Sequence, residues 1–125
     1  MLKNNQLMRK IYHLKTCDTC KRIIKSLPST EKFIFQDIKE EPITVNQLEE
    51  MKNLTGSYEV LFSKRAKLYK EMGLKNEKLS ENDFKRYILE HYTFLNRPVI
   101  MIDNCIFVGN SPKVTQAAID YLKNE

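Results

Sequence analysis

Two cysteines separated by two residues, Cys17 and Cys20, are the side chains of this chain best suited to chemistry. They follow a segment of strand-like sequence and open a segment with helical spacing, which would place a thiolate on Cys17 at the positive end of a helix. Unpaired backbone N–H groups at such a position lower the pKa of a cysteine. Because Cys20 lies one helical turn further on, its sulfur could attack a mixed disulfide on Cys17. We therefore expect Cys17 to act as the nucleophile and Cys20 as the resolving thiol.

The positive charge of the chain is concentrated around these cysteines. The 125 residues hold 21 Lys and Arg against 16 Asp and Glu, a net charge of +5. Residues 1–27 carry seven cations and one anion, so the remaining 98 residues carry 14 cations and 15 anions. Lys15, Lys21 and Arg22 lie nearest to the nucleophile in the sequence and are expected to lower its pKa further. Charge of this local kind, without interleaved basic and aromatic residues, argues against direct binding of nucleic acid.

A zinc site is the alternative interpretation of a Cys-x-x-Cys pair. A structural zinc site needs about four ligands, and the remaining candidates are Cys105, His13 and His91. Cys105 lies in an apolar segment, where a buried cysteine is an ordinary core residue, and His91 continues the apolar side of a helix. Because the sequence has no second cysteine pair, we expect no metal and no bound cofactor.

The sequence carries no signal for export or for a membrane span. Its longest unbroken apolar run is Val-Ile-Met-Ile at 99–102, far short of a transmembrane helix. The N-terminal residues have no apolar stretch followed by a cleavage site. Three cysteines, an odd number, do not resemble a secreted disulfide scaffold. We expect a cytoplasmic protein without a membrane partner, and a monomer as the default for a chain of this size.

Strand-like and helix-like patterns alternate at the start of the chain. A strand of mixed polarity is expected at 10–15, a helix from the cysteines to about Leu27, and a second strand at 32–38. The apolar residues at 33–35 are consecutive, which indicates a strand that is buried on both faces. Pro28 ends the helix. Strand–helix–strand at this spacing predicts two parallel strands with a right-handed crossover.

The middle of the chain has a different, helical character, and we expect an all-helical insertion at approximately 43–93. A capping box at Thr44 predicts a first helix, which Gly56 ends. A second helix is expected at about 63–72, and Ser80 begins a third. These helices separate two regions of strand-like sequence.

The chain ends in a predicted hairpin and a final helix. Two apolar strands of four residues flank Asp103-Asn104, which suit a tight turn with positive φ. Ser111 and Pro112 are suited to the N-cap and the first turn of the last helix. The order β-α-β, helical insertion, β-β-α predicts a single α/β domain over 1–125 with a thioredoxin-like (glutaredoxin-like) core.

Arg97 and Pro98 open the third strand of this layout. A cis-proline at this point would lie beside the reactive cysteine and keep an edge of the sheet free for substrate. An arginine just before it could bind an oxyanion in bidentate fashion or stabilise a thiolate. Lys21 and Arg65 are further candidates for substrate binding; Arg65 belongs to a second basic cluster at 64–67, which could equally be a solvated helix start.

These motifs together resemble the arsenate reductase family of the glutaredoxin-linked type, which also contains the Spx transcription regulators. The resemblance covers nearly the whole chain. It rests on YH and CDTCK within 12–21, LFSKRAKLY at 61–69, LNRPVI at 95–100 and VGNSP at 108–112. The thioredoxin-like domain with a helical insertion is the fold that this family implies.

The resemblance implies a cytoplasmic thiol oxidoreductase. In arsenate reductases of this type a cysteine at the place of Cys17 attacks arsenate, and glutathione with glutaredoxin resolves the adduct. Arg97 matches one of three arginines that hold the oxyanion there, while Ser63 and either Gly109 or Asn110 stand at the places of the other two. The expected substrate is a small oxyanion or a disulfide, and the expected reductant is a glutaredoxin or thioredoxin system.

The Spx branch supplies the alternative function. Cys20 is absent from the pattern of the reductases and resembles Spx, whose Cys-x-x-Cys is a disulfide switch and whose surface binds the RNA polymerase α subunit. The Ser-Lys-Arg-Ala-Lys stretch at 63–67 is also more similar to Spx. The alternative hypothesis is therefore a redox-sensing transcription regulator that has no substrate.

Overall fold

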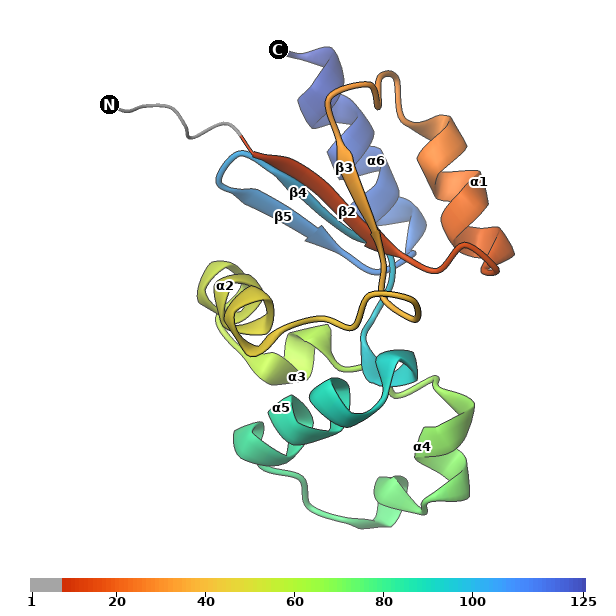
Figure 1. Cartoon of the computed structure of the whole chain (residues 1–125), viewed down its shortest axis with the longest axis vertical. Helices are drawn as coiled ribbons and strands as arrows, with labels where there is room; N and C mark the ends of the chain where they lie inside the picture. Colours follow the sequence, from red (N-terminus) through yellow and green to blue (C-terminus); the bar gives the residue numbers. More distant parts are fainter. Residues whose placement is uncertain (1–7) are drawn as a thin grey trace. The chain divides into compact units, whose positions relative to one another are not determined.

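The structure is a computed structural model that describes residues 8–125 and contains one four-stranded sheet (Figure 1). The strands and α-helices are β2 (Arg9–His13), α1 (Asp18–Ser26), β3 (Ile34–Asp37), α2 (Val45–Thr55), α3 (Tyr58–Leu61), α4 (Lys67–Glu71), α5 (Glu81–Glu90), β4 (Val99–Ile102), β5 (Cys105–Val108) and α6 (Pro112–Lys123). Short 3₁₀ helices lie at Leu74–Asn76 and Tyr92–Phe94. The predicted order of elements, β-α-β, helices, β-β-α, is confirmed.

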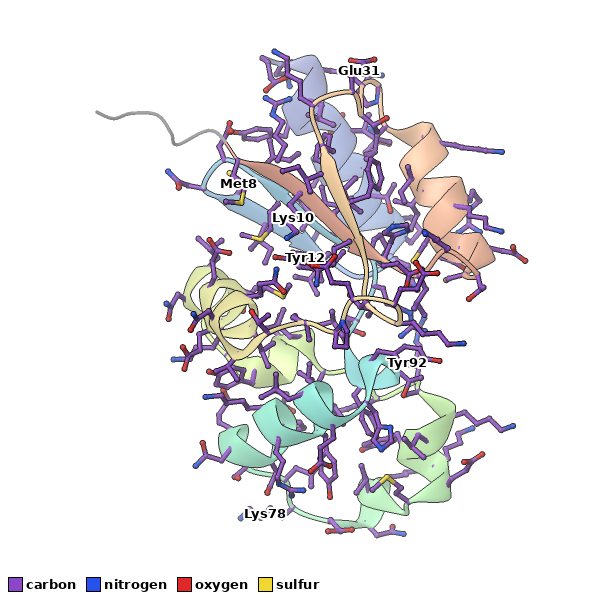
Figure 2. All side chains as sticks on the ribbon, viewed as in Figure 1. Met8, Lys10, Tyr12, Glu31, Lys78 and Tyr92 are labelled. Atoms are coloured by element: carbon purple, nitrogen blue, oxygen red, sulfur yellow. The ribbon has the colours of Figure 1, made fainter. Side chains whose placement is uncertain are left out.

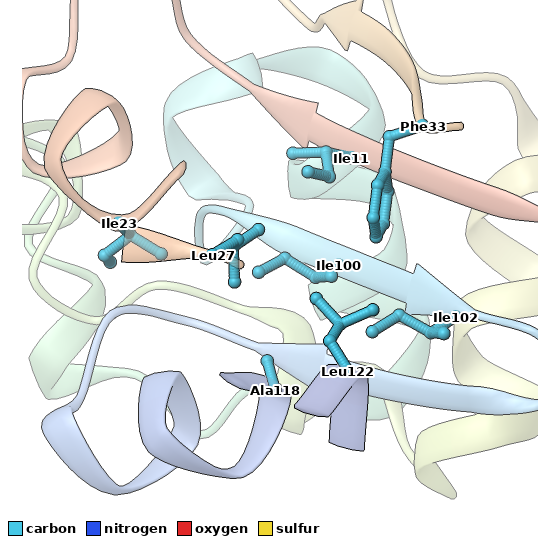
Figure 3. Packing of buried hydrophobic residues seen from close by; sticks show 8 residues of the cluster. All are labelled: Ile11, Ile23, Leu27, Phe33, Ile100, Ile102, Ala118 and Leu122. Atoms are coloured by element: carbon cyan, nitrogen blue, oxygen red, sulfur yellow. The ribbon is translucent and has the colours of Figure 1, made fainter. Parts of the chain in front are cut away.

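The strands are arranged in the order β3-β2-β4-β5. β2 and β3 are parallel, as predicted, whereas β4 is antiparallel to both β2 and β5. The two central strands supply the middle of the core, and α1 and α6 pack against them on one face of the sheet (Figure 3). The buried apolar side chains of this cluster are Ile11, Ile23, Leu27, Phe33, Ile100, Ile102, Ala118 and Leu122. The core therefore holds α1, the helix that begins at the cysteines, against the sheet.

The prediction that the second strand is buried on both faces is wrong. β3 lies at the edge of the sheet, and Ile34 and Phe35 are 62% and 40% exposed. Phe33 and Ile38, at either end of the strand, are buried instead. An unbroken apolar run is typical of a central strand, but it does not reveal how many neighbours the strand has.

Tyr12 of β2 is buried, and the ammonium group of Lys10 lies 5.0 Å from the centroid of its ring (Figure 2). Residues two apart in a strand point to the same side of the sheet. The aliphatic stem of Lys10 can therefore follow the ring while its charge stays near solvent. This contact lies on the face of β2 opposite Ile11, which belongs to the core cluster.

The helix predicted from the capping box at Thr44 is confirmed as α2. The Thr44 side chain accepts a hydrogen bond from the third residue of the helix, and Gly56 ends the helix in a left-handed conformation with φ of 97°. Leu48 and Met51 are buried, but Val45, which the helical spacing placed on the same side, is 47% exposed. It lies at the first position of α2, where the helix has only begun to face its neighbours.

The single helix predicted at 63–72 is wrong in its extent. α3 precedes this segment, α4 covers only its later part, and residues between them are extended or form a turn. Phe62 forms an isolated antiparallel bridge with Leu95, and the Ser63 N–H donates to the carbonyl of Phe94 at 2.7 Å. These pairings need extended backbone, so helical propensity at 63 is overridden by partners about thirty residues further along the chain.

α5 begins at Ser80 with a capping box, as predicted. Phe84, Tyr87 and Ile88 are buried on its inner side. The expectation that His91 continues this apolar side is wrong: α5 ends at the preceding residue, and His91 is exposed with extended backbone. Its ring still makes an edge contact with the ring of Phe94.

The predicted hairpin and last helix are confirmed. β4 and β5 pair across a two-residue turn in which Asp103 has a positive φ of 57°. The Ser111 side chain caps α6 by accepting a hydrogen bond from the Val114 N–H, with Pro112 in the first turn. The peptide bond between Arg97 and the proline that precedes β4 is cis, as expected.

The chain forms two compact units. One comprises residues up to Glu41 together with Arg97–Glu125 and holds the sheet, α1 and α6. The other comprises Pro42–Asn96 and holds the remaining helices. The description of the chain as one domain with an insertion at approximately 43–93 stays a prediction. None of the helices in residues 8–125 is long and apolar enough to cross a membrane.

Candidate functional site

Cys17 is the N-cap residue of α1. The chain leaves β2, makes a turn in which the Cys17 N–H donates to the carbonyl of Leu14 at 3.1 Å, and then enters the helix. The sulfur of Cys17 accepts a hydrogen bond from the Cys20 N–H at 3.4 Å. This role is more often played by the oxygen of Ser, Thr, Asp or Asn. Here the capping atom is a sulfur that faces the first turn of a helix.

The pKa of Cys17 is below its ordinary value. Partial burial acts to raise it, but the N–H and the thiol of Cys20, the positive charge of Arg97 and the N–H of Thr19 together lower it by more. Each of these groups stabilises negative charge on the sulfur. Cys17 therefore ionises more readily than a cysteine in water, and the thiolate is the nucleophilic form.

The direction of this shift agrees with the sequence-based expectation, but its causes differ. The ammonium group of Lys15 pairs with Glu40 at 2.9 Å, and that of Lys21 lies 3.9 Å from Asp18. Both lysine side chains are well exposed to solvent, where water screens their charge. Hydrogen bonds and one arginine, rather than the flanking lysines, lower the pKa of Cys17.

Cys20 has the opposite character. Its side chain is fully buried, and burial raises its pKa to about 11, reinforced by the hydrogen bond and the charge of Cys17. A backbone hydrogen bond at Leu14 and the charge of Arg97 oppose this rise. Cys20 is consequently a neutral thiol at the pH where Cys17 is ionised. All three cysteines of the chain are free thiols.

Arg97 lies close enough to the thiol pair for its charge to act there, and Pro98 directly follows it in the chain. Arg97 is half-buried, and its charge acts on both sulfurs. Pro98 is buried, and its carbonyl accepts a hydrogen bond from the Gly109 N–H at 3.0 Å, which joins the start of β4 to the end of β5. The structure thus brings Arg97 near the cysteines that the sequence singles out.

Of the other predicted site residues, Lys21 is an exposed residue of α1 that faces Asp18. Arg65 is exposed in the turn before α4 and belongs to the unit Pro42–Asn96. Its role in substrate binding stays a prediction. Within residues 8–125 there is no group of three or more His, Cys, Asp or Glu side chains that could hold a metal ion.

Asp37 is a residue of this site that the sequence patterns do not single out. It ends β3 and pairs in register with His13, the last residue of β2. The carboxylate of Asp37 accepts a hydrogen bond from the backbone of the loop that carries Cys17. The parallel pairing of the two strands was the available signal, because the carboxyl ends of parallel strands meet at one edge of a sheet.

The sheet order, with α1 and α6 packed on one face and a Cys-x-x-Cys pair at the start of the first helix, defines a thioredoxin-like fold. The ArsC family model matches residues 12–118, and the chain belongs to the ArsC family. Both the predicted fold and the predicted family resemblance are thereby confirmed.

Comparison with known proteins finds both branches of this family. The chain is 27% identical over 102 residues to the global transcriptional regulator Spx of Bacillus subtilis. This match covers 79% of this chain and 77% of the relative. It resembles the solved structure of an arsenate reductase from Vibrio cholerae with a TM-score of 0.73 and 18% identity, over 93% of this chain and 98% of the other. An arsenate reductase (ArsC) related protein from Brucella melitensis superposes with a TM-score of 0.67 and 20% identity, over 92% and 97%.

Proposed function

We propose that this protein is a cytoplasmic thiol-dependent oxidoreductase that acts as a monomer, with Cys17 as nucleophile and Cys20 as resolving thiol. The observation that carries the proposal is that the Cys17 sulfur accepts a hydrogen bond from the Cys20 N–H and that the two thiols have oppositely shifted pKa values. A low pKa supplies a thiolate for attack, and a high pKa keeps the second thiol protonated until it is needed. Membership of the ArsC family supports the same class of chemistry.

With a disulfide substrate, the first step is attack by the Cys17 thiolate on one sulfur. The bond between the substrate sulfurs breaks, one substrate sulfur leaves as a thiolate, and the other remains in a mixed disulfide with Cys17. Cys20 then loses its proton and attacks the Cys17 sulfur, which releases the second substrate thiolate. Because Cys20 is fully buried, it can meet only a substrate that is already bound to Cys17. The product is a Cys17–Cys20 disulfide, and the substrate has gained two electrons.

With arsenate, the Cys17 thiolate attacks arsenic and one oxygen leaves as water after taking up two protons. Cys20 then attacks the Cys17 sulfur, and the electron pair of the sulfur–arsenic bond remains on arsenic. Arsenic is reduced from the +5 to the +3 state while the two cysteines are oxidised to a disulfide. Arg97 would stabilise the negative charge of the oxyanion, and Lys21, Arg65 and Pro98 are the further candidates for binding it. A glutaredoxin or thioredoxin system returns two electrons to the disulfide, and no bound cofactor is needed.

The test is a steady-state assay with arsenate or a small disulfide, supplied with glutathione and glutaredoxin or with a thioredoxin system. Cys17→Ser should abolish turnover, and Cys20→Ser should abolish it where no external thiol can resolve the adduct on Cys17. Cys105→Ser is the matched control and should retain wild-type turnover. Full activity of Cys17→Ser, or the absence of activity in the wild type with both substrates and both reductants, would contradict the proposal.

A second candidate function is a redox-sensing regulator, for which the similarity to a global transcriptional regulator Spx is the specific observation. In this case oxidation of Cys17 and Cys20 to a disulfide changes the affinity for the RNA polymerase α subunit, and no substrate turns over. A pull-down with the purified C-terminal domain of that subunit, using oxidised and reduced protein, tests it. Binding that depends on the redox state is expected, and absence of binding in both states would exclude it. Neither function requires direct contact with nucleic acid.

A further inference from the structure

The loop that carries Cys17 leaves the sheet beside the end of β3. β2 and β3 are parallel, and their last residues, His13 and Asp37, are paired in register. The Ile38 N–H donates to the His13 carbonyl at 3.0 Å, which extends the contact by one residue. The segment after β3 therefore lies against the start of the cysteine loop.

The carboxylate of Asp37 is the centre of the contacts between these two segments. One oxygen, Oδ2, accepts a hydrogen bond from the Lys15 N–H at 3.0 Å. The other, Oδ1, accepts from the N–H groups of Lys39 and Glu40 at 2.9 Å and 3.3 Å. Both oxygens are thus engaged by backbone donors, two on the segment after β3 and one on the cysteine loop. An amide side chain could not make all these contacts, because its NH₂ group cannot accept.

The ionised form of Asp37 is favoured at this place. Burial acts to raise its pKa, but the three N–H groups and the charge of His13 lower it below its ordinary value by more. His13 in turn has a lowered pKa, caused first by burial and then by the charge of Lys15, against the charge of Asp37. Asp37 is therefore a carboxylate throughout the pH range in which Cys17 titrates.

The contact with Lys15 lies only two residues before the nucleophile. The turn from Leu14 to Cys17 is closed by its own hydrogen bond, from the Cys17 N–H to the Leu14 carbonyl. Asp37 holds an N–H inside that turn. The orientation of the turn decides where the sulfur of Cys17 points, and the Cys20 N–H and thiol can stabilise a thiolate only if the sulfur faces them.

We propose that Asp37 is a positioning residue for Cys17: its carboxylate joins the end of β3 to Lys15 and so directs the Cys17 sulfur toward the first turn of α1. The inference rests on the proposed function, in which Cys17 is the nucleophile. It adds a residue that touches neither the substrate nor the sulfur and acts through the backbone of the loop.

The experiment compares Asp37→Asn with Glu40→Gln. The first removes one of the two accepting oxygens, whereas the second removes only the ion pair between Glu40 and the Lys15 side chain. The rate of Cys17 alkylation by iodoacetamide is measured against pH, with the modified residue identified by mass spectrometry. In Asp37→Asn we expect the pKa of Cys17 to rise by about one unit. At pH values well below that pKa, the rate of alkylation should then be about tenfold lower than in the wild type. Glu40→Gln should match the wild type.

A control variant is needed to show that a loss of stability alone does not raise the pKa of Cys17. Ala118→Gly removes a buried methyl group from the core of the same unit and should leave the pKa of Cys17 unchanged. An equal shift in Ala118→Gly or Glu40→Gln, or no shift in folded Asp37→Asn, would overturn the proposal. The pKa of Cys17 is measured without any substrate, so absence of enzymatic turnover would contradict the proposed function and leave this inference intact.

If Asp37→Asn does not fold, Glu40→Gln protein supplies the measurement. Its backbone amide signals are followed by nuclear magnetic resonance as pH falls through the titration of Asp37. The amides of Lys15, Cys17 and Cys20 should shift together with a common midpoint below 3.8, the ordinary pKa of an aspartate. Independent behaviour of the Lys15 and Cys17 amides would overturn the proposal.

Discussion

The loop at Cys17 and the hairpin at Cys105 place the same side chain in two contrasting surroundings of one unit. Both cysteines are partly buried. Cys17 caps a helix, and its sulfur faces hydrogen-bond donors and an arginine. Cys105 begins β5 and is paired with Ile102 in the sheet. Burial of the residue therefore does not distinguish the two sites, but the donors around each sulfur do.

Tyr121 and Asp103 are neighbours of Cys105, and these surroundings favour the neutral form of the tyrosine. The Tyr121 hydroxyl donates to an oxygen of Asp103 at 3.5 Å. The pKa of Tyr121 is raised, first by burial and then by Cys105 and Asp103. Burial disfavours a charged phenolate, and negative charge on Cys105 or Asp103 would repel it. A helix start offers unpaired N–H groups to a thiolate, whereas Cys105 is paired with Ile102 in the sheet. The position of Cys17 at a helix start is what gives its sulfur the N–H groups that lower its pKa.

The largest expected effect separates these two cysteines directly. At about pH 7 most of the fast alkylation of the native protein should occur at Cys17, because only a thiolate reacts. Cys17→Ser should lower the rate of iodoacetamide uptake by more than about tenfold, and Cys105→Ser should leave it within about twofold. Uptake is followed by mass spectrometry of the intact protein. If Cys105 proved to be the faster-reacting thiol, the contrast drawn between the helix start and the strand would fail.

The parts of the fold that local signals determine could be predicted. Capping residues at Thr44, Ser80 and Ser111 mark three helix starts correctly, because a side chain that satisfies a nearby N–H acts within three residues of sequence. The edge position of β3 and the extended backbone at Ser63 could not be predicted. They depend on which strand is a neighbour and on a pairing with Phe94, and neither leaves a local pattern.

The local features of the candidate site could also be predicted, and the features that depend on distant residues could not. The spacing of Cys17 and Cys20 predicts a cysteine at a helix start with a second thiol one turn away, and the structure places both residues there. Their roles as nucleophile and resolving thiol stay predictions. The cause of the lowered pKa was not predictable, because it depends on Arg97, which is distant in the sequence, while the flanking lysines are exposed to solvent. Asp37 was missed for a similar reason: its contact with the loop depends on the parallel register of β2 and β3.

The buried thiol of Cys20 should make the stability of the fold depend on pH. The pKa of Cys20 is raised from an ordinary value of 9.0 to about 11 in the folded state. Between these values the unfolded chain loses this proton and the folded chain keeps it, so rising pH favours unfolding. The stabilisation is complete below about pH 9 and is lost as pH rises through 11, an effect of about 3 kcal/mol.

Urea unfolding of reduced protein at a series of pH values measures this dependence. Cys20→Ser should lack the extra loss of stability between about pH 9 and pH 11, because a serine hydroxyl does not titrate there. The lowered pKa of Cys17 has the opposite sign: it adds stability above the ordinary value, which is lost as pH falls through the folded pKa. An identical pH profile for Cys20→Ser and the wild type would contradict the assignment of Cys20 as the buried, neutral thiol.

The smallest expected effect distinguishes Arg97 from the lysines that crowd Cys17 in the sequence. The charge of Arg97 lowers the pKa of Cys17 after the hydrogen bonds of Cys20. Arg97→Met should therefore raise this pKa by about half a unit, a roughly threefold fall in alkylation rate below the pKa. Arg97→Lys retains the charge and should retain most of the reactivity. Lys21→Met should change the rate by less than about twofold, because an exposed ammonium group 3.9 Å from Asp18 is screened and partly neutralised. The same pH series measures both variants. Equal pKa shifts in Arg97→Met and Lys21→Met would mean that the basic cluster of residues 1–27 lowers the pKa of Cys17. Net local charge, and not the donors at the helix start, would then distinguish Cys17 from Cys105.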